Sequence, residues 1–407
     1  MTEPFASYHR KLPDLAGQLA SRGSLGVLVF DFSPLSVIED QYGSRTYQEV
    51  RDQLFKLVAE NQGKAFRSKD IPALDEARGL RLILFADHRR DALPMLQSDV
   101  RVLRQRLASD LVPRLARIAL PYLKSLPRID VGQGLAIYNP IMHPARQIAR
   151  AVQEAIRYGA VRRQVEEFET LEKLQEVILT ERIMTAFQPI VGIEDRKILG
   201  YEALTRGGDV ANPQMADALF SIAQEHRLLV ELDRLCRRKA LLSSKRLPPD
   251  AKIFINTLPV TIRDPEFQGK HLIKFLEQAR VSPQRIVIEI TEKLVIENYS
   301  LFQDAMSYFT ELGMSLAVDD VGAGYSGLET IARLTPAYLK IDMALVRDVH
   351  ASTVNQQMVG AIIALGHGIG AKVIAEGIQT EDELRTLVSL GVDYGQGYLI
   401  GRPGLTP

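Results

Sequence analysis

Short apolar runs alternate with longer amphipathic segments through the carboxyl-terminal half of the chain, from about Glu181 onward. Eight of the runs have the length and residue types of buried strands. They lie near residues 185–191, 197–203, 252–257, 286–291, 314–319, 337–341, 372–376 and 393–399. Apolar residues at helical spacing fill most of the intervals, at 213–245, 270–280, 298–312, 325–334, 354–369 and 381–390. Strands that alternate with helices in this way predict an α/β fold, a TIM-like (β/α)8 barrel.

The first two strands of this barrel are joined differently from the others. Only residues 192–197 separate them, which is too short for a helical crossover between parallel strands. We therefore expect an antiparallel first strand that forms a hairpin with the second.

The amino-terminal part of the chain has a different pattern. Apolar runs at 25–30, 81–85 and 131–138 predict strands, and amphipathic segments at 44–59 and 93–123 predict helices. These elements indicate a compact α+β domain with an antiparallel sheet.

A long connecting helix is predicted between the two parts. Apolar residues recur every three or four positions from Ile148 to Ile178, and Gly159 predicts a break or bend. Two interpretations of this apolar stripe stay open: it packs on its own domains, or it forms a dimer seam or signalling lever. The predicted boundaries are residues 1–147 for the first domain, 148–180 for the connecting helix and 181–407 for the barrel.

Composition narrows the class of protein. The chain has 407 residues, 46% of them hydrophobic and 25% charged, which suits a soluble protein of two domains. Fifty basic and fifty acidic side chains cancel, so duplex DNA held by phosphate charge is not an expected partner. No apolar stretch approaches the roughly 20 residues that a bilayer needs, and the amino terminus lacks a signal-peptide pattern, so we expect a cytoplasmic protein. The single cysteine, Cys236, has no partner for a disulfide or a zinc site, and ordinary packing is favoured over catalysis.

Polar residues end six of the predicted barrel strands. In a barrel of this kind, catalytic groups come from the carboxyl ends of the strands, so these side chains are expected to face one pocket. They are Glu202, Asn256, Glu289, Asp319, Lys340 and Glu376. Each acid taken singly is also explained as a helix cap or a rim ion pair, but that explanation is poor for the whole set.

The segment DDVGAGYSGL places Asp319 and Asp320 side by side at a strand end. Two adjacent carboxylates repel each other, and a divalent metal site is the simplest way to hold them together. The candidate donors contain no sulfur or imidazole, which favours Mg²⁺ or Mn²⁺. The oxygen donors are Glu202, Asn256, Glu289, Asp319, Asp320 and Glu376. Because six exceed what one Mg²⁺ usually takes, we expect two metals bridged by Asp319, a site suited to phosphodiester hydrolysis. Lys340 is expected to orient the attacking water or to offset charge on phosphate oxygens.

These residues resemble the EAL domain family of cyclic di-GMP phosphodiesterases. The matching strings, in family order, are FQPIV, GYEALTRG, FIN, EITE, DDVGAGYSGL, LKID, AEGIQT and QGYLIGRP. The resemblance implies a TIM-like barrel with an antiparallel first strand and hydrolysis of cyclic di-GMP to linear pGpG with Mg²⁺ or Mn²⁺. It also implies inhibition by Ca²⁺ and a homodimer formed through the barrel, the connecting helix or both.

The resemblance carries roles onto individual residues. The implied metal ligands are Glu202, Asn256, Glu289, Asp319 and Asp320. The implied catalytic groups are Lys340, beside the attacking water, with Glu376, Gln396 and Glu292, the last of which steadies the loop after the paired aspartates. The implied substrate-binding residues are Gln188, Leu204, Arg206 and, by a less close match in ELDR, Asp233.

Four positions depart from the family's usual strings. Val321, Ala323 and Gly327 replace Phe, Thr and Ser in the loop after Asp320, and Gln379 replaces a glutamate. Loss of an aromatic anchor at position 321 is expected to loosen that loop. Since no implied ligand or base is missing, we expect these departures to affect rate or regulation.

The amino-terminal part resembles a degenerate GGDEF (diguanylate cyclase) domain. The strings are LGVLVFDFSPLSVIEDQYGS, VGQGLAIYNP and ARQIARAVQEAI, and Asp31 matches a metal aspartate. Glu39 and Gln48 replace an expected asparagine and aspartate, and DEARGLRLILF carries no GGDEF string. We therefore expect a regulatory or dimerising domain that does not synthesise cyclic di-GMP.

Three functions are weighed for the whole chain. The first is a cyclic di-GMP-specific phosphodiesterase controlled by its amino-terminal domain. The second is a receptor that binds cyclic di-GMP with little hydrolysis and signals through the connecting helix to a regulatory protein partner. The third is a scaffold that keeps the barrel only for assembly. The complete set of ligands and the lysine favours the enzyme.

Overall fold

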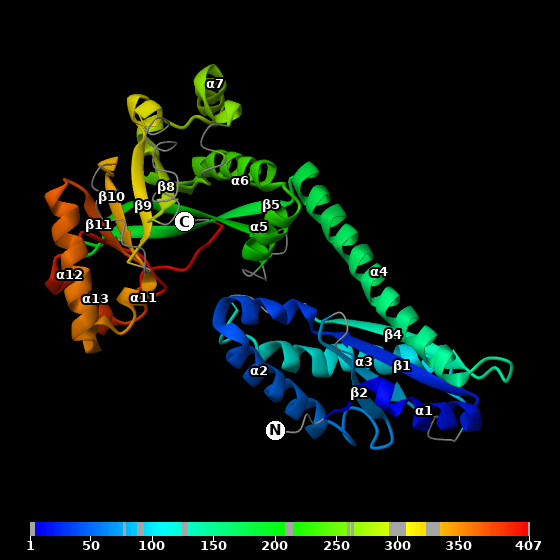
Figure 1. Cartoon of the computed structure of the whole chain (residues 1–407). Helices are drawn as coiled ribbons and strands as arrows, with labels where there is room; N and C mark the ends of the chain where they lie inside the picture. Colours follow the sequence, from blue (N-terminus) through cyan, green and yellow to red (C-terminus); the bar gives the residue numbers. More distant parts are fainter. Residues whose placement is uncertain are drawn as a thin grey trace. The chain divides into compact units, whose positions relative to one another are not determined.

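The computed structural model of the chain describes residues 5–75, 79–87, 93–123, 128–207, 215–258, 261, 264–292, 307–322 and 334–405. The chain divides into two compact units, Met1–Glu169 and Thr170–Pro407 (Figure 1). Within the described residues, no helix combines the length and apolar character needed to cross a membrane.

The first unit is a four-stranded sheet with helices on both faces. The strand order is β2 (Ile71–Asp75), β3 (Arg81–Ala86), β1 (Ser24–Asp31), β4 (Asp130–Ile137), and every neighbouring pair is antiparallel. Alternate side chains of β1 point to opposite faces. Leu28 and Phe30 pack with α2 (Ser36–Glu60) and α3 (Gln97–Arg117), whereas Val27 and Val29 pack with α1 (Tyr8–Arg22) and α4 (Pro144–Leu179). The predicted α+β domain with an antiparallel sheet is confirmed.

Two elements of this unit, α1 and β2, are absent from the predicted set. Helix α1 contains Pro13, which breaks the usual helical signal, yet Ser7 caps its start and Gly23 ends it in the left-handed region. Strand β2 has only five residues and includes Pro72. Both elements contain a proline, which is unusual inside a helix or strand, so the sequence pattern did not predict them.

Helix α4 continues through Gly159 without the predicted break. Gly159 faces β4 at ordinary van der Waals distance, since a Cβ atom there would lie 3.4 Å from the Cα atom of Gly132. Side chains at Gly132 and Gly134 would overlap the carbonyl oxygens of Ala155 and Ala151. Gly132 and Gly134 therefore let the helix lie directly on the strand.

Replacing Gly134 by alanine is expected to lower the free energy of unfolding by about 3 kcal/mol, because the new methyl group meets backbone that cannot easily move. Gly17, in α1, is the matched control in the same unit, since nothing lies within 4 Å of its Cβ position. Gly17→Ala should stabilise by about 0.5–1 kcal/mol through helix propensity. Urea unfolding followed by circular dichroism checks both values, and equal stability of the two variants would contradict this account of the packing.

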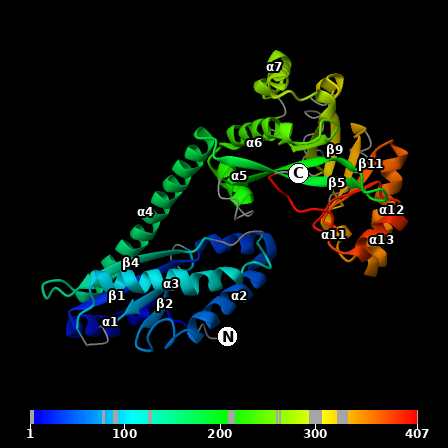
Figure 2. The ribbon, with the colours of Figure 1, turned by 180° about the vertical axis from the view of Figure 1, so that it is seen from behind.

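The second unit is a closed eight-stranded barrel. Its order is β10 (Tyr338–Ile341), β11 (Lys372–Ala375), β12 (Tyr394–Gly395), β5 (Ile183–Gly192), β6 (Ile198–Gly207), β7 (Lys252–Asn256), β8 (Ile286–Thr291), β9 (Ser315–Val321). Strand β5 is antiparallel to both neighbours, and the other adjacent pairs are parallel. Figure 2 shows the long β5–β6 hairpin from behind. The predicted barrel and its antiparallel first strand are confirmed.

Helices surround this barrel. They include α5 (Met215–Glu225), α6 (Leu229–Ser243), α7 (Gly269–Ala279), the short α11 (Met343–Val346), α12 (Thr353–Gly368) and α13 (Glu381–Leu390). The single helical segment predicted at 213–245 is two helices, because Arg227 takes a left-handed conformation between them. The helix predicted at 325–334 and the first part of that at 298–312 lie outside the described residues.

Candidate active site

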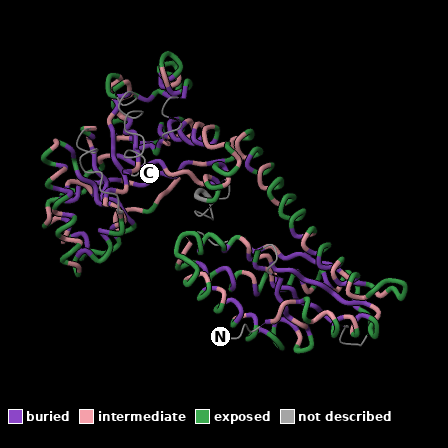
Figure 3. Tube along the Cα trace, in the orientation of Figure 1, coloured by how far each residue is buried: buried purple, intermediate pink, exposed green. Residues whose placement is uncertain are grey.

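An apolar layer closes the middle of the barrel, and a polar layer lies directly above it. The apolar layer contains Ile190, Phe254, Val287, Ala317, Tyr338 and Ile374, all buried. Figure 3 shows long buried stretches of the trace in this unit. Side chains two positions apart on a strand share a face, so the next inward positions toward the carboxyl ends are fixed. Those positions hold Asn256, Glu289, Asp319, Lys340 and Glu376; on the antiparallel β5 the step runs backward, from Ile190 to Gln188. Strand periodicity thus brings residues far apart in sequence to one end of the barrel.

Lys340 lies at the centre of this polar layer. Its Nζ atom is 2.7 Å from Glu289 Oε1, 2.7 Å from Glu376 Oε1 and 3.1 Å from Asp319 Oδ1. Glu202 Oε2 is 3.6 Å away. The ammonium and the Glu289 carboxylate are both fully buried. Four carboxylates from four strands therefore share one buried cation.

Amide side chains tie Glu202 into this cluster. Gln396 Nε2 donates to Glu202 Oε2 at 2.6 Å and to Gln188 Oε1 at 3.0 Å. Asn256 Nδ2 donates to Glu202 Oε1 at 3.1 Å. Gln188 in turn donates to the carbonyl oxygen of Gly401 at 3.0 Å. Each oxygen of Glu202 thus has a fixed direction.

The electrostatics of the cluster are far from those of groups in water. Burial raises the pKa of Glu289 and of Glu376 well above the ordinary value, even though Lys340 opposes that shift. Burial alone would lower the pKa of Lys340, but the surrounding carboxylates raise it well above its ordinary value. Lys340 is therefore a permanent cation among acids that outnumber it.

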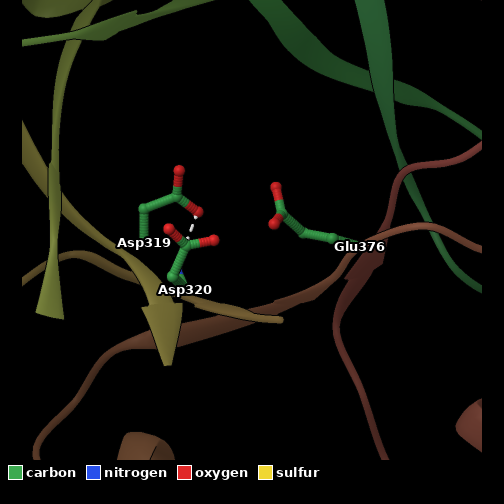
Figure 4. Close-up of side chains that lie close together, drawn as sticks. All are labelled: Asp319, Asp320 and Glu376. Atoms are coloured by element: carbon green, nitrogen blue, oxygen red, sulfur yellow. Dashed lines mark hydrogen bonds between the residues drawn. The ribbon is translucent and has the colours of Figure 1, made fainter. Parts of the chain in front are cut away.

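Asp319 and Asp320 lie near the end of β9 and face Glu376 (Figure 4). One ligand oxygen of each of these three residues lies within 4.8 Å of the other two. Asp320 has a left-handed backbone, and its N–H donates to Asp319 Oδ1 at 3.0 Å. Burial, then the charges of Asp319 and Asp342, raise the pKa of Asp320 to about 6.

Glu292 holds the start of the next loop. Its Oε2 accepts a hydrogen bond from the N–H of Gly322 at 3.1 Å, and the side chain is buried. Val321 is also buried and packs in the cluster around Leu339 and Ile341, so the smaller side chain is well accommodated at the end of β9. Ala323 and Gly327 lie outside the described residues.

A cavity of about 290 Å³ opens beside the cluster, beneath α5 and α6. Asn256 and Glu289 line both the cavity and the cluster, and Leu204, Arg206 and Asp233 line the cavity walls. Gln188 is not part of this lining and belongs to the amide network instead. Cys236 also lines the cavity, where burial raises its pKa to about 12, so the thiol stays protonated and is no nucleophile.

The chemistry of the polar layer fits hard divalent cations. Neither oxygen of the buried Glu289 receives a well-oriented hydrogen bond from the described residues, although Lys340 lies 2.7 Å from one of them. Glu202, Asp319 and Glu376 add three more carboxylates around the same ammonium, and Asp320 lies beside Asp319 and Glu376. Oxygen donors with excess negative charge are what Mg²⁺ and Mn²⁺ bind.

Two further charged groups lie at this site beyond the residues implied by the resemblance. Asp342, two positions after Lys340, is close enough to raise the pKa of Asp320. The LKID string holds the only signal for it, an acid following the lysine by the strand period. Arg237, buried in the cavity wall, gives no sequence signal, because an arginine on an amphipathic helix is usually exposed.

Glu383 fixes the loop that carries Glu376. Its carboxylate accepts hydrogen bonds from the N–H groups of Asp348 at 3.1 Å, Gln379 at 2.8 Å and Thr380 at 3.0 Å. Burial would raise its pKa, but these three donors lower it. The carboxylate therefore stabilises the loop only while it is charged.

We expect Glu383→Gln to lower the free energy of unfolding at neutral pH by about 2 kcal/mol, because a neutral amide replaces a charged acceptor. The folded-state pKa lies below the unfolded value, so this stabilisation is complete above about pH 4.3 and fades as pH falls through the lowered pKa. Urea unfolding at several pH values measures it. The gap between wild type and variant should narrow in acid, and a gap that widens would contradict the assignment.

Comparison with known proteins gives the family. The EAL domain model matches residues 171–403. The chain is 29% identical over 236 residues to the probable cyclic di-GMP phosphodiesterase PdeN of Escherichia coli, covering 57% of this chain and 45% of that protein. It is 25% identical over 398 residues to the cyclic di-GMP phosphodiesterase NbdA of Pseudomonas aeruginosa, covering 93% and 48%. The chain thus spans less than half of either relative.

A solved structure shares the barrel. It is described as the PaMucR phosphodiesterase in complex with c-di-GMP, with 25% identity and a TM-score of 0.52. The match covers 58% of this chain and 97% of that one. Since the family model spans more than half of the sequence and the site follows the strand ends of the barrel, the chain belongs to the EAL domain family.

Proposed function

We propose that the chain hydrolyses one 3′-5′ phosphodiester bond of cyclic di-GMP to give linear pGpG. One observation carries this proposal: a buried lysine and five carboxylates, which come from β6, β8, β9 and the end of β11, converge at the mouth of the barrel, beside a cavity. PdeN, NbdA and the PaMucR structure, whose names carry the same activity, support the choice of substrate.

The residues that would hold two Mg²⁺ or Mn²⁺ ions are Glu202, Asn256, Glu289, Asp319 and Asp320. Such ions supply an activated water and stabilise charge on the phosphate oxygens when bound. Hydrogen bonds from Asn256 and Gln396 orient the Glu202 carboxylate without a bound ion. We expect Ca²⁺ to inhibit, because it prefers more ligands and looser geometry than Mg²⁺.

Lys340 and Glu376 have separate roles in the proposal. The raised pKa of Lys340 keeps it charged at neutral pH, so it offsets negative charge that builds on the phosphate during displacement. Glu376 lies opposite Asp319 and Asp320, where it can accept a hydrogen bond from the attacking water. Glu292 holds the backbone after Asp320, and Gln396 holds Glu202.

The cavity is the proposed place for one half of the dinucleotide. Leu204 offers an apolar wall and Arg206 a cation for phosphate, while Asp233 offers a carboxylate for a guanine. Gln188, at the other side of the cluster, is also proposed to contact the ligand; in the structure its Oε1 accepts from Gln396 and its Nε2 donates to the carbonyl oxygen of Gly401.

The amino-terminal unit is proposed as a regulatory, degenerate GGDEF-like domain. The similarity to NbdA covers 93% of the chain and so includes this unit. Asp31, the matched metal aspartate, lies 3.6 Å from Arg81 of the paired strand. Because a guanidinium already faces that carboxylate, we propose no synthesis of cyclic di-GMP here. Dimerisation through the barrel or α4 belongs to the same proposal.

The test is turnover of cyclic di-GMP by the full chain with Mn²⁺ or Mg²⁺, with products separated by chromatography. Wild type should give pGpG, and Glu202→Ala should give none. Equal traces from the two proteins would refute hydrolysis by this site. Tight binding of intact cyclic di-GMP, with no product after long incubation, would instead favour the receptor.

A further inference from the structure

One wall of the cavity carries a buried ion pair, of which the proposed function uses Asp233 but gives Arg237 no role. Asp233 and Arg237 lie one turn apart on α6, and both line the cavity. Their exposed fractions are only 3% and 2%. Arg237 Nε lies 2.8 Å from Asp233 Oδ2. Burying two charges is unfavourable unless each is held in good geometry, so this pair needs an explanation.

Arg237 is held firmly from its other side. Its NH2 atom lies 3.3 Å from Asp264 Oδ2, and its guanidinium carbon lies 3.9 Å from the centre of the Phe267 ring. Asp264 is itself fixed by Arg234, 2.9 Å from its Oδ1. The guanidinium is therefore clamped between two carboxylates and one ring face, with little freedom to turn.

The charge of Arg237 favours the ionised form of Asp233, together with hydrogen bonds from the Thr261 side chain and the Leu258 backbone, which also lower the pKa of Asp233. Burial raises the pKa of Asp233, and the charge of Arg237 is the largest effect that opposes this rise. The charge of Asp264 acts in the opposite sense. An ionised carboxylate only accepts hydrogen bonds, whereas a protonated one also carries a donor that would face a ligand's donor.

We infer that Arg237 is a positioning residue that fixes Asp233 as an oriented acceptor for two adjacent N–H donors of a purine. Guanine offers such a pair on its N1 and its 2-amino group, so this inference rests on the proposed function and deepens it. Hypoxanthine lacks the 2-amino donor and would leave one buried acceptor of Asp233 unmatched. Arg237 thereby determines base specificity without touching the reacting phosphate.

The experiment is calorimetric titration of the full chain in Ca²⁺ with cyclic di-GMP and with cyclic di-IMP, its hypoxanthine analogue. Wild type should bind cyclic di-GMP at least about tenfold more tightly, the effect of one unmatched buried hydrogen-bonding group. Arg237→Met, similar in volume but uncharged, should bring the ratio of the two affinities close to one. Arg237→Lys keeps a cation beside Asp233 and should retain most of the ratio, which a purely structural role would not predict.

A double variant guards against simple misfolding. Asp233→Asn with Arg237→Met leaves no unpaired charge between these two positions, so it should fold where Arg237→Met alone does not. Its ratio should also be close to one. A folded variant without Arg237 that keeps the wild-type ratio would overturn the inference, as would equal binding of both dinucleotides by an active wild type. Wild type that neither binds nor hydrolyses cyclic di-GMP would refute the proposed function itself.

Discussion

Replacing Lys340 by methionine is expected to lower kcat for cyclic di-GMP hydrolysis by about a thousandfold, the usual effect of removing a buried group that stabilises developing charge. Lys340 has no exposed surface and lies within 3.6 Å of four carboxylates. Methionine fills a similar volume and offers no charge. Steady-state kinetics at saturating Mn²⁺ measures the change.

The same variant should lose stability in the absence of metal. Breaking a buried charge cluster by removing one partner typically costs about 3–5 kcal/mol, because the remaining charges lose their compensation. Added Mn²⁺ should restore much of that loss without restoring turnover. This separation distinguishes a catalytic role from a structural one.

Lys372 provides the matched control for this substitution. It also pairs with a carboxylate, Asp393 at 2.7 Å, but its side chain is 57% exposed and lies at the start of β11, away from the cluster. Lys372→Met should leave kcat unchanged and alter stability by less than about 1 kcal/mol. Wild-type turnover in Lys340→Met, or an equal loss in the two variants, would contradict the assignment.

The site was predictable because strand periodicity is simple. The side chain of a polar residue at the end of an apolar run lies on the same face of the strand as the side chain two positions earlier. Phe254 and Asn256 are one such pair, and Val287 and Glu289 are another. Closure of the barrel then brings these side chains together, since all parallel strands end at one mouth. The shortness of the first connection likewise fixed the direction of β5.

What escaped prediction depended on contacts that no local pattern carries. The break at Arg227 divides one amphipathic segment into α5 and α6 through a single left-handed residue. Gly159 signalled a helix break by propensity, but α4 continues through it and packs on β4, where Gly132 and Gly134 allow the close approach. Arg237 is buried because Asp264 and Phe267, from one later segment of the chain, meet it beside Asp233 of its own helix.

Glu289→Gln is expected to abolish hydrolysis and yet to stabilise the metal-free protein, by about 1–2 kcal/mol. Burial opposes the charge of Glu289, as its strongly raised pKa shows, and the neighbouring acids Glu202 and Asp319 oppose it further. Glutamine has the same shape and keeps an oxygen for the ammonium of Lys340, but it removes one negative charge. The substitution is thus expected to raise the free energy of unfolding while it abolishes hydrolysis, which indicates that the carboxylate is present to bind a ligand.

Metal makes this trade-off measurable. With EDTA, thermal unfolding of Glu289→Gln should have a higher midpoint than wild type. Mn²⁺ at a hundred times its dissociation constant should stabilise wild type by about 2.7 kcal/mol, whereas the variant should gain much less because it has lost a ligand. Glu277→Gln, an exposed position on α7, should behave as wild type in both conditions. Equal Mn²⁺ stabilisation of wild type and Glu289→Gln would mean that Glu289 holds no metal, and the cluster around Lys340 would then need another explanation.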